Sequence, residues 1–432
     1  MRIVIGKRHR YNEGTSQFGQ ITYVSLFILT VIVSFGKITE GLFPNTFSFE
    51  LVQLLLCSTI FFRERTEIKR KWKMLFFSYI VITVFYYYYF SSEFHFDRVL
   101  IVKNIVLNIM QALSNLMLFF TFYTSSIDRK IESILRFIFS CQVITYILYI
   151  FLNSSDGVFP TTWGAKYIMQ DGTGRFKGTF SEPVVMGFML GISVFYILIK
   201  YDTWLKYPIT GILMYIIFFE CKAKFAVIAL PIAIFIAIGG KYKFKYFWHI
   251  IIIAAFVGVI ALSYYVRNNV IISLSFIGEY FGRNSSFFTR FFFIFTAMIK
   301  LVKYPLGTGF GLSYEYFSGM ESLLDLGRTL GMDTSEVRSY IENQSGAFSS
   351  KDSFSMIVSS FGFVGIILYL GIIKRLITMK VYRRHLVRGL IVFILLESTV
   401  TVNILHFPYI LYGIFCIMLI NSMKVNNKLF LP

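Results

Sequence analysis

The sequence contains few of the residues that point to a disulfide-bonded or metal-binding protein. It has only 4 cysteines in 432 residues. Cys57, Cys141 and Cys416 lie within hydrophobic runs and Cys221 lies at the edge of one, so the sequence indicates neither a disulfide framework nor a zinc site. No Asp-x-Asp motif occurs, which argues against a metal ion that holds a diphosphate. The chain also lacks a low-complexity segment, an internal repeat and a signal-peptide cleavage site after its first apolar run.

Hydrophobic residues dominate what is present. They make up 56% of the sequence, aromatic residues alone account for 19%, and the mean hydropathy is +0.66, which is far too apolar for a soluble domain. Since about 17–25 apolar residues in a helix cross a bilayer, we predict an all-α polytopic membrane protein with about twelve transmembrane helices. The predicted spans are 21–36, 46–62, 74–90, 99–123, 133–152, 183–200, 203–220, 223–239, 247–266, 354–373, 388–405 and 407–423.

The formal net charge of +19 could indicate a nucleic-acid partner, but its distribution indicates membrane topology instead. With the N-terminus in the cytoplasm, the predicted inner loops carry the whole excess, as the positive-inside rule requires. Loop 374–388 has six basic and no acidic residues, whereas the outer loop 267–353 has eight of each. We therefore predict that both termini are cytoplasmic and that the chain binds no nucleic acid.

The expected organisation is a single integral membrane domain over residues 1–432 with two large external loops, 153–182 and 267–353. The second loop contains an amphipathic segment, Phe287 to Lys303, that we predict to be a helix lying in the outer membrane interface with its apolar side down. Its polar residues recur at helical spacing and form a narrow stripe: Thr289, Thr296, Lys300 and Lys303, with Arg290 beside them.

A turn follows this helix. Pro305 and the glycines after it, Gly307, Gly309 and Gly311, end the helix and predict a flexible segment. We interpret the helix and its turn together as a membrane-surface lid that carries one placed arginine, Arg290.

The first external loop ends in the sequence D-G-T-G-R-F-K-G-T-F-S-E-P, residues 171–183. Its glycines allow a close backbone approach, and Arg175 and Lys177 bring positive charge to the membrane surface. A guanidinium there can bind a phosphate with two parallel hydrogen bonds, or both cations can anchor the loop to lipid headgroups. Glu182 precedes a proline that fits the first turn of the next span.

Two further places carry charge at the predicted outer surface. Lys222 and Lys224 lie in a tight turn after Glu220, where lysine is disfavoured, so either an anionic ligand or an ion pair with Glu220 is expected. Lys351 and Asp352 stand at the mouth of the span over 354–373. Asp352 is either a partner for the positive end of that helix or a member of a site.

Four motifs in this order resemble the O-antigen polymerase and O-antigen ligase superfamily of bacterial polysaccharide assembly. They are G-R-F-K-G-T-F-S-E-P around Arg175, K-F-A-V-I-A from Lys224, the segment from Arg290 into P-L-G-T-G-F-G, and K-D-S-F before F-G-F-V-G. The resemblance covers the C-terminal two-thirds of the chain. Two departures occur: Lys224 stands where the family often has arginine, and Lys351 and Asp352 stand where ligases have a His-Asn pair, which favours the polymerase branch.

The resemblance implies a glycosyltransferase, and since the sequence has no Asp-x-Asp motif we expect it to be metal-independent and to use no cofactor. Its donor is expected to be a growing glycan on undecaprenyl diphosphate and its acceptor a single lipid-linked repeat unit. Preorganised cations would stabilise the leaving diphosphate, and a carboxylate would act as the base for the acceptor hydroxyl. The catalytic candidates are Arg175, Arg290, Asp352 and Glu182, and the substrate-binding candidates are Lys177, Lys222, Lys224, Lys351, Gly307 and Gly309.

Membrane lipids, a chain-length regulator and a flippase of the same pathway are the expected partners, in the bacterial cytoplasmic membrane with the active site on the extracytoplasmic face. Two alternatives stay open: a ligase that transfers the glycan to a lipid or protein acceptor, and a flippase or other transporter of lipid-linked oligosaccharide. The missing internal repeat argues against transport, because many transporters contain one.

Overall fold

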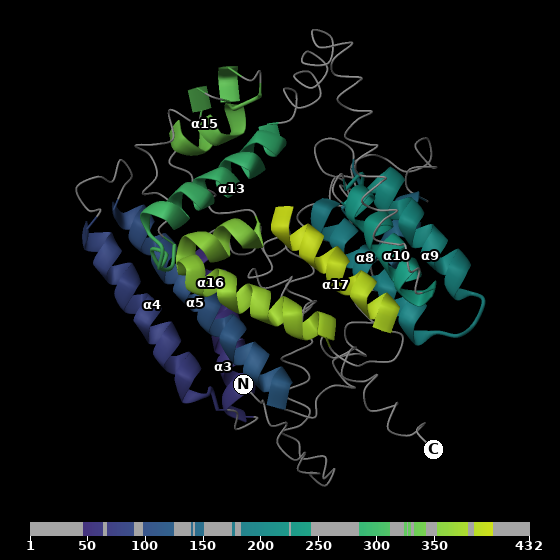
Figure 1. The fold of residues 1–432 in the computed structure, drawn as a ribbon, viewed down its shortest axis with the longest axis horizontal. Coiled ribbons are helices and arrows are strands. Elements are labelled where there is room, and N and C mark those ends of the chain that lie inside the picture. Colours follow the sequence, from purple (N-terminus) through teal and green to yellow (C-terminus); the bar gives the residue numbers. More distant parts are fainter. Residues whose placement is uncertain are drawn as a thin grey trace. The chain divides into compact units, whose positions relative to one another are not determined.

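The computed structural model describes residues 46–63, 67–89, 98–124, 140, 143–150, 175–177, 183–223, 226–242, 285–311, 324–325, 327–329, 332–342, 352–378 and 384–400. Within these residues every regular element is a helix (Figure 1), which confirms the all-α prediction for this part of the chain. The predicted spans over 21–36, 247–266 and 407–423 lie outside the described residues, as does much of 133–152.

The labelled helices follow the hydrophobic runs of the sequence. The predicted span over 183–200 has the same bounds as α8, whereas the span over 203–220 is divided between α9 and the π-helix η2. In chain order the helices are α3 (Thr46–Arg63), α4 (Arg70–Tyr89), α5 (Arg98–Thr124), α8 (Pro183–Lys200), α9 (Lys206–Tyr215), η2 (Ile216–Glu220), α10 (Ala226–Tyr242), α13 (Ser285–Lys303), α15 (Ser335–Glu342), α16 (Ser353–Thr378) and α17 (Arg384–Val400).

Three helical segments in the described part of the chain are long and apolar enough to cross a membrane. They are Ile101–Leu118 in α5, Pro183–Lys200 and Ser353–Gly371 in α16. They support membrane association, while the expected number of twelve spans stays a prediction.

The chain forms two compact units. One contains residues 1–73, 110–186 and 405–422, and the other contains 74–109, 187–404 and 423–432. Helices α10, α13, α16 and α17 lie wholly in the second unit, and α4 lies in it from Met74 onward. The contacts among α4, α13 and α16 therefore belong to one unit.

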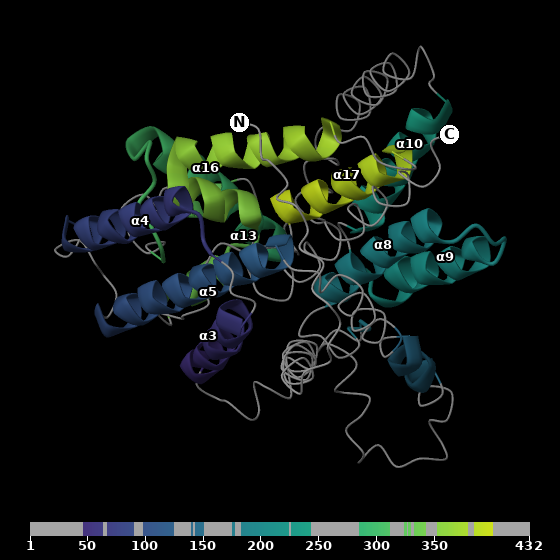
Figure 2. The ribbon, with the colours of Figure 1, turned by 90° about the horizontal axis from the view of Figure 1, so that it is seen from below.

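Glycines bring three helices of the second unit close together (Figure 2). Gly191 of α8 lies against the ring of Phe393 in α17, and Gly389 of α17 lies against the backbone of Ala233 in α10. A side chain at either glycine would collide with its neighbour. Since apolar lipid supplies no hydrophobic force between helices, small residues that permit such close packing are a main source of helix association in membranes.

Candidate active site at the start of helices α13 and α16

Helix α13 buries most of its polar stripe, with only Lys303 at its end exposed, and exposes part of its apolar surface. Thr289 is fully buried, and Lys300 is only 1% exposed. The exposed large side chains are apolar: Phe295, Met298, Ile299 and Val302, the last being 86% exposed. This distribution differs from our expectation of a stripe that faces water, because the protein interior takes up the threonines and Lys300. An apolar outside around a polar inside is typical of a helix that faces lipid.

Helices α13 and α16 pack side by side and run in the same direction (Figure 1). Ala297 and Leu301 of α13 form a buried core with Val358 of α16. Near the start of both helices the charge of Arg290 acts on Asp352, and where α13 has ended and α16 is broken at Gly362, the Pro305 carbonyl accepts a hydrogen bond from the Phe363 N–H at 2.8 Å. The contacts therefore follow the same order along both segments.

Helix α16 is broken at Gly362, where φ is 55° and ψ is −141°. Figure 1 shows the two halves meeting at a sharp bend. The break frees backbone groups, and the turn after α13 satisfies them. Thr308 donates its N–H to the Ser359 carbonyl at 3.1 Å, and Gly309 donates its N–H to the Ser360 carbonyl at 3.0 Å. Non-helical backbone at membrane depth is tolerated where protein supplies such partners.

The turn after α13 is therefore a fixed structure and not the flexible segment that its glycines led us to expect. Gly307, Gly309 and Gly311 all have positive φ, between 73° and 88°. A side chain at Gly307 would meet the Ser360 backbone, and one at Gly309 would meet Thr83 of α4. The glycines are needed because two backbones pass within contact distance. Whether Gly307 and Gly309 also touch a substrate stays a prediction.

Helix α4 closes this arrangement from a third side. The Tyr79 hydroxyl donates to the Phe361 carbonyl at 3.0 Å, and the Thr83 hydroxyl oxygen accepts the Phe310 N–H at 2.8 Å. One helical turn further on, the ring of Tyr86 lies edge-on to Tyr304, with 5.3 Å between the centroids. Residues 79, 83 and 86 share one face of α4, so a single stripe fixes both the turn and the broken helix.

Asp352 caps α16 and is completely buried. Its Oδ1 accepts the Ser355 N–H at 2.6 Å, which is the usual use of a helix N-cap. Its Oδ2 is buried without a hydrogen bond to any described residue. Burial raises the pKa of the Asp352 carboxyl to about 6, against the opposing effects of the Ser355 N–H, the nearby Ser355 hydroxyl and the Arg290 charge. The capping role is thus shown, and one carboxylate oxygen is left over.

Arg290 is the only site candidate among the described residues that acts electrostatically on Asp352. It lies one position after Thr289 on α13 and is partly exposed. The two residues are 62 positions apart in the sequence, and the parallel packing of α13 and α16 brings their helix starts together. A cation therefore acts on a buried carboxylate that lies at the N-terminus of α16, where the helix dipole is positive.

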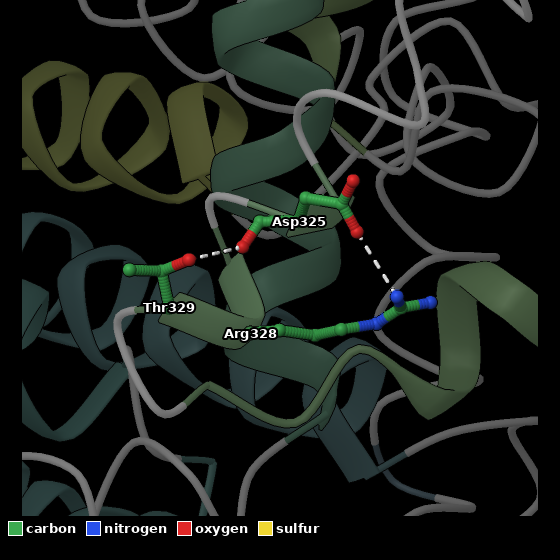
Figure 3. A network of polar contacts seen from close by, with 3 residues as sticks. All are labelled: Asp325, Arg328 and Thr329. Carbon is green, nitrogen blue, oxygen red and sulfur yellow. Dashed lines mark hydrogen bonds and ion pairs between the residues drawn. The ribbon is translucent and has the colours of Figure 1, made fainter.

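A second arginine of the same outer loop has a different environment. Arg328 donates to Asp325 at 3.0 Å, and both side chains are at least half exposed (Figure 3). Thr329 donates to the Asp325 carbonyl at 2.8 Å. Such an exposed pair contributes about 0–1 kcal/mol to stability. Arg328 is therefore paired with a carboxylate at the exposed surface of the loop.

Arg175 and Lys177 belong to the first compact unit, so they are described apart from Arg290. The ring of Phe176 packs against Tyr146 and Tyr149, with centroid distances of 5.2 and 5.0 Å. This aromatic contact fixes the segment on the helix over 143–150. Arg175 is partly exposed, while Lys177 is 1% exposed. Burial of Lys177 differs from our expectation that both cations lie at the surface.

Lys222 ends the π-helix η2 in an unusual conformation. Its φ of 45° makes it the one non-glycine residue with positive φ among the described residues, and its side chain is exposed. The next residue, Ala223, is buried against Gly187 of α8. Among the described residues no ion pair joins Lys222 to Glu220, and both readings of this turn, an anionic ligand and an ion pair with Glu220, stay predictions because Lys224 lies outside the described residues.

The remaining candidates, Glu182, Lys224 and Lys351, lie outside the described residues. The structure adds residues that the sequence reasoning missed, namely Tyr79, Thr83, Ser355 and Gly362. A serine repeated at 355 and 359 on one face of an apolar helix was the available signal for Ser355. No three His, Cys, Asp or Glu side chains of the described ranges gather as metal ligands, and a metal-independent reaction stays a prediction.

Comparison of the chain with known families, curated proteins and solved structures finds no match.

Proposed function

We propose that this chain polymerises lipid-linked oligosaccharide repeat units, transferring a growing glycan from undecaprenyl diphosphate to the next lipid-linked unit. The observation that carries the proposal is that Arg290, on the first turns of α13, lies near enough to the buried Asp352 at the start of α16 for its charge to act on that carboxyl. It joins a cation for a leaving diphosphate to a carboxylate for an incoming hydroxyl. The proposal also rests on the family resemblance of the motifs that contain both residues.

The residue types fit the charges of this reaction. As the bond between the anomeric carbon and the diphosphate oxygen breaks, its electron pair stays on the diphosphate, and a preorganised guanidinium stabilises that added charge best where water is scarce. Arg290 takes this role, with Arg175 as the second arginine. The proton of the acceptor hydroxyl goes to ionised Asp352, which becomes neutral, so the carboxylate loses the charge that the diphosphate gains.

The other candidates have supporting roles in the proposal. Lys177, Lys222, Lys224 and Lys351 attract the anionic substrate, Glu182 is a second candidate base, and Gly307 and Gly309 shape the turn beside the glycan. The exposed apolar side chains of α13 would leave room for the lipid tails to arrive through the membrane. Direct attack at the anomeric carbon inverts its configuration. The site would face outward from the bacterial cytoplasmic membrane, with both termini inside.

Transport is the second candidate, because a specific observation favours it. Helix α16 is discontinuous at Gly362, and discontinuous helices often form the substrate sites of transporters. A transporter would move a lipid-linked unit across the membrane without forming a bond between units. The two functions therefore differ in where single repeat units accumulate when the chain is inactivated.

The test measures the length and sidedness of glycans on the lipid carrier in cells that produce the wild type, Arg290→Ala, Arg175→Ala or Arg328→Ala at equal protein level. Arg328→Ala is the matched control, since this arginine lies in the same loop and is paired at the surface. A polymerase predicts a ladder in wild type and control, and single units on the outer face in Arg290→Ala.

Three other outcomes contradict the proposal. Single units that accumulate on the cytoplasmic face indicate a transporter. A full-length ladder on the carrier that fails only to reach its final acceptor indicates a ligase. An unchanged ladder in Arg290→Ala removes the arginine from the reaction and leaves the proposal without the observation that carries it.

A further inference from the structure

A second side chain beside Asp352 is buried without a hydrogen-bond partner. Ser355 is fully buried, and its Oγ, like Asp352 Oδ2, forms no hydrogen bond of good geometry with any described residue. The two groups lie close together, because the Ser355 N–H donates to Asp352 Oδ1 and the Ser355 hydroxyl favours the ionised form of the carboxyl. A buried polar atom that stays unsatisfied costs about 1–3 kcal/mol, so a ligand group that hydrogen-bonds to both atoms would be stabilised there.

The surrounding charges decide what kind of partner fits. A cation is disfavoured, since one carboxylate oxygen and one hydroxyl are few ligands and the positive charge of Arg290 acts on the same point. An anion is disfavoured by Asp352 itself. A neutral group with an O–H bond satisfies both atoms, because its hydrogen can go to Asp352 Oδ2 while its oxygen accepts from Ser355 Oγ.

We propose that Asp352 and Ser355 form a binding site for a neutral hydroxyl group, and that this is the acceptor sugar hydroxyl of the transfer. The hydroxyl-binding site itself is inferred from burial, hydrogen bonding and the neighbouring charges, whereas its assignment to the acceptor sugar rests on the proposed function. Ser355 then binds the acceptor directly, by donating a hydrogen bond to the oxygen of that hydroxyl. During transfer the hydroxyl proton moves to Asp352 Oδ2, a new bond forms between the acceptor oxygen and the anomeric carbon, and the diphosphate leaves with the old bond's electrons.

The first experiment compares Ser355→Ala with Ser359→Ala in the purified full-length chain, using lipid-linked repeat units extracted from the producing cells. Ser359 is a matched control because it lies one turn further along the same face of α16 and is also buried. Loss of one neutral hydrogen bond changes binding by about fivefold. We expect Ser355→Ala to raise KM by about that factor with little change in kcat, and Ser359→Ala to leave KM within twofold.

Asp352→Asn separates the cap from the reaction. Asparagine caps a helix as well as aspartate does, so the variant keeps the fold and loses only the proton acceptor. We expect kcat to fall by about 100-fold or more without a lower midpoint of thermal unfolding. Equal KM values in the two serine variants, or full activity in Asp352→Asn, would overturn the proposal.

A second measurement does not depend on polymer formation. Dicyclohexylcarbodiimide, which modifies carboxyl groups in apolar surroundings, is reacted with the full chain, and modification of Asp352 is followed by mass spectrometry. Octyl glucoside serves as the hydroxyl-bearing probe and an octyl sulfobetaine as the control without hydroxyls. We expect the glucoside alone to slow modification in the wild type, and this protection to disappear in Ser355→Ala.

The two measurements fail in different ways. Protection that requires Ser355, in a chain that makes no polymer, keeps the hydroxyl-binding site and removes the polymerase. Polymerisation in which the serine variants behave alike, with equal protection by glucoside and sulfobetaine, keeps the polymerase and removes the site. A water molecule as the permanent partner of both atoms predicts this second result.

Discussion

Replacing Gly362 by alanine tests whether the break in α16 is held as tightly as the structure indicates. Gly362 has φ 55° and ψ −141°, a conformation that L side chains rarely adopt. An added Cβ would also meet the Pro305 carbonyl and the backbone of Leu306 and Gly307. These contacts involve backbone on both sides, so neither can move aside as a flexible side chain would.

The expected cost has two parts. The unfavourable conformation costs about 1–3 kcal/mol. Displacing the turn also weakens the three backbone hydrogen bonds from Thr308, Gly309 and Phe363, each contributing about 0.5–1.5 kcal/mol. Together these give a loss of about 3–7 kcal/mol, which for a chain of this size corresponds to a decrease in Tm of about 3–8 °C.

Gly371→Ala is the matched control, because it makes the same change in the same helix at a glycine with nothing within 4 Å of the added atom. There alanine improves helix propensity by about 1 kcal/mol, so Tm should stay level or rise. The assay is thermal unfolding of the purified full-length chain in one detergent. Equal shifts in Tm for the two variants would show that the neighbouring backbone does not hold the break at Gly362 in place.

Three further substitutions have defined outcomes. Lys222→Gly should raise stability by about 1 kcal/mol, since it relieves the positive φ of that lysine, while Lys222→Ala should not. If both variants lose anion binding, the loss is due to the missing charge and not to the backbone conformation. Asp352→Asn should stabilise the chain by about 3 kcal/mol at pH 7.5, because burial raises the pKa of the Asp352 carboxyl in the folded chain from 3.8 to about 6 and each pKa unit corresponds to about 1.4 kcal/mol. Folding of the wild type takes up a proton between these two pH values, so its stability falls as pH rises through them. The advantage of the variant should therefore vanish toward pH 4. Tyr79→Phe removes the hydrogen bond to the Phe361 carbonyl and should lower the free energy of unfolding by about 1–3 kcal/mol. The control is Tyr88→Phe on the same helix, where the side chain is 70% exposed, and it should not change the free energy of unfolding measurably in the same assay.

The helices were predictable from the sequence because long apolar runs leave few other structures in a membrane. Pro183 marked the start of α8, and hydropathy alone located its end at Lys200. Boundaries were less certain where a polar turn is short, as between α9, η2 and α10. A π-helix cannot be foreseen from hydropathy, since it has the same residue composition as the α-helix it extends.

The site was only partly predictable. Asp352 and Arg290 were both expected to be functional, yet nothing in their spacing shows that α13 and α16 run parallel. The glycines after Pro305 predicted a flexible turn, since a sequence records the freedom of glycine and not the backbone that passes beside it. The orientation of the polar stripe on α13 was mistaken for a similar reason, because an amphipathic pattern shows that two faces differ and not which solvent each one meets.

The outward apolar face of α13 makes the surrounding solvent a determinant of the Arg290 position. In lipid or detergent, Phe295, Met298 and Val302 can stay outside while Thr289 and Lys300 stay within. In water the same exposed side chains would lie against solvent, at a cost of about 25 cal/mol for each Å² of apolar surface. The helix that carries Arg290 is therefore held in place partly by its apolar surroundings, and the purified chain should be kept in detergent or a nanodisc.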